Sequence, residues 1–227
     1  IIPSNNTDLG TVARYMHVFP IIGIGIGLLI ASIGFGLSFF LEPLIVALLV
    51  VASIAIITGI HHTDGLADFA DGLMTRGTKE KKRQAMKDLS TGSAGIVSVV
   101  LSIVGVIIAL SLTTGYELFQ AILLSEILAK FSMVLMASIG KSAATGSNSP
   151  FMQIMKDKRR LAVAGVITII PLVVIGGTTG LILFGASIGV TLFLIGLSTR
   201  SFGGITGDVL GAANELTRLS SLLIFVS

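Results

Sequence analysis

Long apolar runs are the feature of this sequence that most restricts its fold. Six of them alternate with polar stretches, and each holds about 17 to 23 residues. At ~1.5 Å per residue such a run crosses the roughly 30 Å hydrocarbon core of a bilayer. Helices are the open-chain structure that satisfies every backbone N–H and C=O there. The runs are 18–40, 44–60, 94–112, 118–139, 161–176 and 181–197.

The chain is therefore expected to be all-α, a polytopic transmembrane helical bundle forming a single integral-membrane domain over 1–227. Only 12% of its residues are charged, whereas soluble domains have ~25%. The apolar residues 222–226 resemble the start of a further span. We therefore expect six full spans plus the start of a seventh. The first residue is Ile1, not an initiator Met, so we also expect that some N-terminal residues are missing.

Lysine and arginine are distributed unevenly among the connections. Of the 15 in the chain, all but Lys130 lie in the N-terminal segment or in three long polar connections, and the short connections have none. Cytoplasmic loops of membrane proteins are enriched in Lys and Arg. The N-terminus, the site segment 61–93 and the loops 140–160 and 198–218 are therefore expected to face the cytoplasm. This predicts a multi-pass protein of the cell membrane with its active site on the cytoplasmic side.

The first run contains several glycines that membrane helices tolerate. Small residues at such positions let two helix backbones approach closely. We expect these glycines to mark close helix packing; they are Gly23, Gly25, Gly27, Gly34 and Gly36.

An acidic cluster follows the second run directly. Asp64, Asp68 and Asp71 are spaced i, i+4, i+7, which places their carboxylates on one face of a helix. Like charges at this spacing repel each other, so a cation should compensate them. Hard oxygen ligands in this number suit Mg²⁺, or alternatively Mn²⁺, better than zinc. We predict that these acids hold Mg²⁺, with Asp88 as a further ligand or as a base.

A solvated loop is the alternative interpretation of this segment. It explains the basic residues Lys79, Lys81 and Lys82 as well as a phosphate-binding role does. It explains the aspartates less well, because apolar residues are interleaved with them and acids at membrane depth usually have a function. Arg76 and Lys87 are candidates to hold substrate phosphates.

Two further sites contain candidate substrate-binding residues. Glu126 precedes Lys130 by one helical turn. Either the two neutralise each other in the bilayer, or Lys130 faces a cavity and binds phosphate, and the sequence leaves both open. In the last polar stretch, Gly207 and Asp208 lie among glycines that permit close backbone approach. We favour substrate contact over a flexible connector there.

Four sequence blocks carry a resemblance that extends over nearly the whole chain. The blocks 62–72, 86–88, 92–95 and 203–212 are similar, in this order, to those of the adenosylcobinamide-GDP ribazoletransferase (cobalamin 5′-phosphate synthase) family. The resemblance implies a multi-span, Mg²⁺-dependent enzyme of late cobamide synthesis. It implies metal binding by Asp64, Asp68 and Asp71, a ligand or base role for Asp88, and a catalytic role for His62 rather than His61. Asp71 is also a catalytic candidate.

The resemblance also implies a reaction and its partners. The ribose 3′-hydroxyl of α-ribazole 5′-phosphate would attack the cobinamide-side phosphorus of adenosylcobinamide-GDP, forming a phosphodiester and releasing GMP. The partners expected are these two substrates and the lipid bilayer, without nucleic acid. The sequence leaves open whether the chain forms a homo-oligomer.

Two other functions are weighed against this one. Residues 68–76 are also similar to the start of the CDP-alcohol phosphotransferase motif, but Thr75 and Ala85 depart from it. A cation transporter with an acidic site is the alternative from another class. Transport sites lie near the bilayer midplane, often within internal repeats. Here the acids lie together at one predicted membrane face, and no repeat is evident.

Overall fold

A computed structural model describes residues 13–143 and 149–227, and regular structure in these ranges is helical. The predicted all-α class is confirmed. One isolated bridge pairs Ser142 with Ile205. The elements are η1 (Met16–Val18), α2 (Phe19–Leu37), α3 (Pro43–Thr58), α4 (His61–Met74), α5 (Lys79–Ala85), α6 (Ser93–Ser111), α7 (Gly115–Ile139), α8 (Ser149–Ile154), α9 (Lys158–Phe202) and α10 (Gly207–Phe225).

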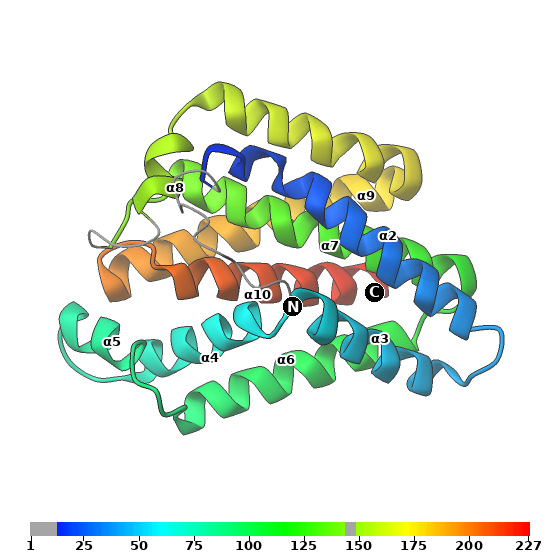
Figure 1. Ribbon diagram of the computed structural model, residues 1–227, viewed down its shortest axis with the longest axis horizontal. Coiled ribbons are helices and arrows are strands. Elements are labelled where there is room, and N and C mark those ends of the chain that lie inside the picture. The colour runs from blue at the N-terminus through cyan, green and yellow to red at the C-terminus, as the bar shows by residue number, and fades with distance from the viewer. Residues whose placement is uncertain (1–12, 144–148) are drawn as a thin grey trace, which may run out of the picture.

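The helices support a multi-pass membrane protein. In the described ranges, four segments are long and apolar enough to cross a bilayer: η1 with α2, α6, α7 and α9. The pair α3 and α4, bent by 95°, makes a fifth if it is counted as one broken span. Helix α9 is interrupted at Gly177, where φ is 53°, and Figure 1 shows its two arms running in opposite directions. Length and apolar composition of the helices thus give four or five spans, and the predicted six spans plus the start of a seventh are not confirmed.

The connections divide between the two ends of the bundle. Figure 1 shows α5, α8 and the α9–α10 connection at one end. The α2–α3 turn, the α6–α7 turn and the break in α9 lie at the other. The exposed faces between them carry many large apolar side chains, among them Ile22, Leu101 and Val174. This arrangement suits a bundle surrounded by lipid.

Helix α7 is the centre of the bundle, since nearly all its residues from Leu118 to Ala137 are buried. Helix α2 packs along it through glycines. A Cβ added at Gly23 would lie 2.8 Å from the carbonyl oxygen of Glu126, and one at Gly27 would lie 3.2 Å from the Cα of Leu123. Gly34 is similarly close to neighbouring side chains of α3 and α7. Close packing was therefore predicted correctly for these three glycines.

The same prediction is wrong for the other two glycines of α2. A Cβ added at Gly25 or Gly36 would meet nothing within 4 Å. Both positions lie on the side of α2 that turns away from α7. The alternating glycines of the sequence therefore do not share one packing face.

Replacing Gly23 by Val is expected to lower the thermal stability of the detergent-purified protein. The new side chain would overlap the α7 backbone, and such overpacking typically costs ~1–3 kcal/mol. Gly25→Val is the matched control, because it adds the same side chain to the same helix in open space. Equal melting temperatures for the two variants would contradict the α2–α7 contact.

Helix α10 corrects the prediction of a loop over 198–218. Helix α9 continues to Phe202, α10 begins at Gly207, and only residues 203–206 connect them. The expected seventh span from Leu222 is the end of α10. Hydropathy misses this helix because its buried face carries Asn214, Glu215 and Arg218. In the segment 61–93, the helix that the spacing of the aspartates predicts is α4, and a second short helix, α5, follows it.

The predicted loop 140–160 is only partly described. Helix α8 lies within it, and α9 begins before its end. Residues 144–148 and the N-terminal segment 1–12, whose cytoplasmic location the charge pattern predicts, lie outside the described residues.

Candidate active site

Two of the sequence blocks meet where α4 crosses α10, and two glycines allow the contact. A Cβ added at Gly65 of α4 would lie 3.0 Å from the carbonyl oxygen of Asp208 and 3.3 Å from the Cα of Gly211. A Cβ at Gly211 would lie 3.2 Å from the carbonyl oxygen of His62. The backbones therefore touch without intervening side chains. Residues about 145 positions apart in the sequence are brought to one site by this crossing.

A cavity of about 320 Å³ opens beside this crossing. Its polar lining residues come from both helices and include predicted site residues from each block. The other lining residues are apolar. The residues from α4 and α10 that carry polar groups or are glycines are His61, His62, Asp64, Gly65, Gly207, Asp208 and Gly211, and the apolar lining residues are Met16, Phe19, Met133, Phe151 and Leu210. A pocket lined by both polar and apolar residues suits an organic ligand that carries a charged group.

The acidic residues of the two blocks lie close enough to repel one another. Asp68 interacts electrostatically with Asp208, Asp64 and Asp71, and of these the interaction with Asp208 is the strongest. In the described ranges, Asp64, Asp68 and Asp208 form no ion pair. Asp208 accepts a hydrogen bond from its neighbour Thr206 at 3.3 Å. The site therefore holds a concentration of negative charge that no lysine or arginine of the described chain pairs with directly.

Asp71 has a different environment from the other acids. Its Oδ2 accepts a hydrogen bond from the backbone N–H of Gly92 at 2.7 Å, and its Oδ1 accepts one from Gly95 at 2.8 Å. Both amides belong to the N-terminus of α6, where backbone donors lack intrahelical partners and the helix dipole favours an anion. A Cβ at Gly92 or Gly95 would come within 2.5 Å of this carboxylate. Asp71 thus fixes α6 to the end of α4.

Asp71→Asn is expected to destabilise the protein, because an amide cannot accept both backbone hydrogen bonds and carries no charge. Loss of a charged cap typically costs ~1–2 kcal/mol. The measurement is the melting temperature in detergent, compared with that of Asp64→Asn, whose carboxylate makes no hydrogen bond to a helix end. Equal melting temperatures in the two variants would show that Asp71 does not act as a cap.

The remaining predicted residues of segment 61–93 lie at the surface. Asp88 is exposed, and its Oδ1 accepts hydrogen bonds from the backbone and the hydroxyl of Ser90, which lower the pKa of the Asp88 carboxyl. Arg76 and Lys87 are also exposed. Lys87 interacts electrostatically with Asp208, so it lies near the acidic group. The structure does not bring Asp88 into contact with Asp64 or Asp68.

Helix α5 holds the end of α9 through basic side chains. Arg83 donates to the carbonyl oxygen of Phe202 at 2.6 Å, and Lys79 donates to that of Thr199 at 3.5 Å. Cations at a helix C-terminus pair with its free carbonyl groups and its dipole. Lys82 donates to the carbonyl oxygen of Leu73 in α4. These basic residues therefore have structural partners.

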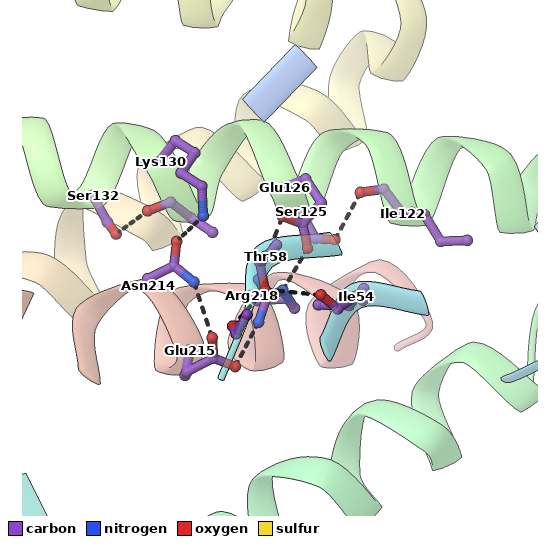
Figure 2. A network of polar contacts seen from close by, with 12 residues as sticks. Ile54, Thr58, Ile122, Ser125, Glu126, Lys130, Ser132, Asn214, Glu215 and Arg218 are labelled. Atoms are coloured by element: carbon purple, nitrogen blue, oxygen red, sulfur yellow. Dashed lines mark hydrogen bonds and ion pairs between the residues drawn. The ribbon is translucent and has the colours of Figure 1, made fainter. Parts of the chain in front are cut away.

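A buried ionic network connects α7 to α10 (Figure 2). Arg218 donates to Oε1 and Oε2 of Glu126, at 2.5 and 3.4 Å, and to Oε2 of Glu215 at 2.5 Å. Asn214 donates to the other oxygen of Glu215 at 3.0 Å and accepts from Lys130 at 2.6 Å. Two acids and two bases make the network neutral, which is the condition for burying charges without a large penalty.

Lys130 forms one end of this network and also lines a second cavity of about 260 Å³. Its ammonium group pairs with Asn214 and makes no ion pair with Glu126 among the described residues. Of the two alternatives that the sequence left open, direct pairing of Glu126 with Lys130 is not observed, because Arg218 occupies the Glu126 carboxylate and Lys130 lines the cavity. His62 lines both cavities, and its buried Nδ1 has no partner in the described part of the chain.

Sequence reasoning missed the roles of Asn214, Glu215 and Arg218. A signal was present, because Glu215 and Arg218 are spaced i, i+3 and precede an apolar stretch, which is the spacing of a helical ion pair. It also missed the amides of Gly92 and Gly95 as partners of Asp71. Backbone donors carry no side-chain signal, so only the pairing of glycines with an acid 21 residues earlier could have suggested it.

Comparison with known proteins identifies the family. The family model described as cobalamin-5-phosphate synthase matches residues 1–226. The chain belongs to this family. Proteins named adenosylcobinamide-GDP ribazoletransferase are similar to it along most of their length. That of Methanocella arvoryzae is 34% identical, over 95% of this chain and 86% of the relative. Those of Pyrococcus abyssi and Thermococcus onnurineus are 38% and 33% identical, over 78% and 96% of this chain and 74% and 89% of the relatives.

No solved structure matches the chain. The resemblance inferred from the four blocks is nevertheless confirmed by the family match. It covers the segments that form both cavities and the ionic network. Membership favours the transferase over the two alternative functions.

The donor chemistry of the site fits a hard divalent cation. Asp64, Asp68 and Asp208 form no ion pair among the described residues and repel one another, the situation that a bound cation relieves. In the ranges that the structure describes, no three acidic or histidine side chains converge as a ready metal cluster. Asp208 fits this group better than Asp88, which is turned to solvent. Asp71 has lone pairs free besides those that accept from α6.

Proposed function

We propose that this protein transfers the adenosylcobinamide phosphate group from adenosylcobinamide-GDP to the ribose hydroxyl of α-ribazole 5′-phosphate. The observation that carries the proposal is the crossing of α4 and α10, which joins His62, Asp64 and Asp208 at one cavity in a chain of this family. We propose that the end of the bundle with α5, α8 and the α9–α10 connection faces the cytoplasm, as the lysines and arginines of the long connections predict. The membrane would then be the cell membrane.

The reaction makes one P–O bond and breaks another. The acceptor hydroxyl oxygen attacks the cobinamide-side phosphorus, and the bond from that phosphorus to the bridging oxygen breaks. GMP leaves with the bridging oxygen, and the hydroxyl proton passes to a base. His62 is our candidate for that base, because it lines both cavities and its Nδ1 has no hydrogen-bond partner among the described residues. Of the other catalytic candidates of the sequence, Asp71 accepts two hydrogen bonds from α6, and Asp88 is exposed and lines neither cavity.

Asp64, Asp68 and Asp208 would hold Mg²⁺, or Mn²⁺ in its place. Such an ion, when bound, would neutralise negative charge on the diphosphate and on the leaving GMP. The exposed Lys87, near Asp208, is placed to pair with the outer phosphate of the donor. Arg76, exposed just after the end of α4, is a candidate for the same role.

Release of GMP tests the proposal. Detergent-purified protein receives adenosylcobinamide-GDP and α-ribazole 5′-phosphate, with Mg²⁺ or with EDTA. We expect GMP and the phosphodiester product in equal amounts, only when both substrates and the ion are present. Restoring activity after EDTA by adding Mn²⁺ would support the hard-ligand site. Absence of GMP from protein that remains folded would contradict the proposal, and CMP release from a CDP-activated alcohol would favour the other transferase family.

A further inference from the structure

The second cavity differs from the first in its chemistry. It is bounded mainly by apolar side chains of α2, α3 and α7, and its polar residues are Thr58, His62 and Lys130. No acid lines it. Since Phe19, His62 and Met133 line both cavities, the two lie side by side with His62 between them. The first cavity is therefore suited to a cation and the second to an anion with an apolar body.

Lys130 has hydrogen-bonding capacity that the network does not use. An ammonium group has three N–H donors, and among the described residues Lys130 has one hydrogen-bond partner, the side-chain oxygen of Asn214. The side chain is only 4% exposed. A buried charged donor is costly to leave unpaired, so a ligand that accepts from it is favoured. Figure 2 shows the Lys130 ammonium reaching toward Asn214 from α7.

The network behind Lys130 keeps its charge from being cancelled at the cavity. Arg218 engages both oxygens of Glu126 and one oxygen of Glu215. The acids are therefore committed to the guanidinium group, and Lys130 is held by the neutral amide of Asn214. This arrangement presents a positive charge at the cavity wall while the network as a whole stays neutral. An acid in place of Asn214 would pair with Lys130 and cancel its positive charge at the cavity wall.

We propose that the second cavity is the acceptor subsite, where Lys130 binds the 5′-phosphate of the acceptor nucleotide and the apolar wall receives its base. This rests on the proposed function and specifies where one of its substrates binds. In the first cavity Asp64 and Asp208 would hold the ion that serves the donor's diphosphate, whereas Lys130 gives the second cavity a cation of its own. Bound on Lys130, the acceptor's 5′-phosphate lies apart from those acids while the ribose remains at His62. The apolar wall consists of Phe19, Ile22, Ile26, Ile57 and Met133.

The test compares two acceptors that differ only in the phosphate, α-ribazole 5′-phosphate and α-ribazole. The ratio of their kcat/KM values measures what the phosphate contributes. The double variant Lys130→Met/Glu215→Gln removes one base and one acid. The buried network therefore stays neutral, and we expect the variant protein to fold. We expect the ratio to fall by about 10- to 100-fold in this variant, the usual range for losing one charged hydrogen bond.

Lys156→Met is the matched control, because it makes the same substitution at an exposed lysine outside both cavities. The control should keep the wild-type ratio. An unchanged ratio in the double variant, with GMP still released, would overturn the acceptor subsite and leave the proposed function intact. No GMP from the wild-type protein with either acceptor would instead overturn the proposed function.

A phospholipid headgroup could supply the same phosphate chemistry, because the cavity is bounded by lipid-facing residues such as Ile22. The assay is therefore run in detergent without phospholipid and again with added anionic phospholipid. If the double variant lowers the ratio of the two kcat/KM values equally without and with phospholipid, the result supports the nucleotide subsite. Inhibition of the wild-type protein by the lipid, relieved in the double variant, would assign the cavity to lipid and overturn the proposal.

Discussion

Asp68→Asn is expected to reduce kcat for GMP release by about 10³-fold or more, with little change in the melting temperature. Asp68 lies among Asp64, Asp71 and Asp208 and interacts with all three. Its carboxylate makes no ion pair in the described structure, so its removal relieves repulsion and leaves no buried partner unpaired. Loss of a group that stabilises charge in a phosphoryl transfer typically costs a factor of 10²–10³, and loss of a metal ligand adds to this.

Asp157→Asn is the matched control for this experiment. It is the same substitution, at an exposed aspartate in the connection before α9, outside both cavities. We expect its activity to stay within about threefold of the wild type. Full activity of Asp68→Asn would contradict the assignment of the acidic group as the metal site. A second readout is the Mg²⁺ concentration at half-maximal activity, which should rise in Asp208→Asn.

The location of the site could be predicted from the sequence, whereas its exact members could not. Spacing alone predicts that Asp64, Asp68 and Asp71 share one face of α4. It does not show that Asp71 accepts two hydrogen bonds from α6, because the donors are backbone amides. Nor does spacing show that Asp208 interacts with Asp68. That proximity depends on the contact between Gly65 and Gly211, a feature of two helices packing and not of either one alone.

The fold could be predicted where segments are uniformly apolar. Helices α2, α6 and α7 follow the predicted runs closely, because hydropathy and bilayer thickness determine them. The prediction fails for α10, where hydropathy averages over a polar buried face and an apolar one. The polar residues of α10 are tolerated because their partners come from α7. A single segment carries no information about such partners, so the helix was mistaken for a loop.

Arg218→Met is expected to destabilise the protein most among the variants considered. The substitution leaves the carboxylates of Glu126 and Glu215 without their guanidinium partner, and Glu126 is fully buried. Removing one partner of a buried ion pair typically costs ~3–5 kcal/mol. A marginally stable membrane bundle would then fail to accumulate or would melt at a much lower temperature. Arg159→Met, at an exposed arginine at the start of α9, is the control.

The double variant Glu126→Gln/Arg218→Met separates lost charge balance from lost packing. It removes one acid with the base, so that Glu215 and Lys130 remain and the network is again neutral. We expect it to recover more than half of the stability lost in Arg218→Met, as measured by thermal unfolding in detergent. Equal instability of the single and double variants would show that Arg218 acts through packing alone. Recovery would show that charge neutrality is what allows the polar helix α10, and with it Asp208, to pack inside the bundle.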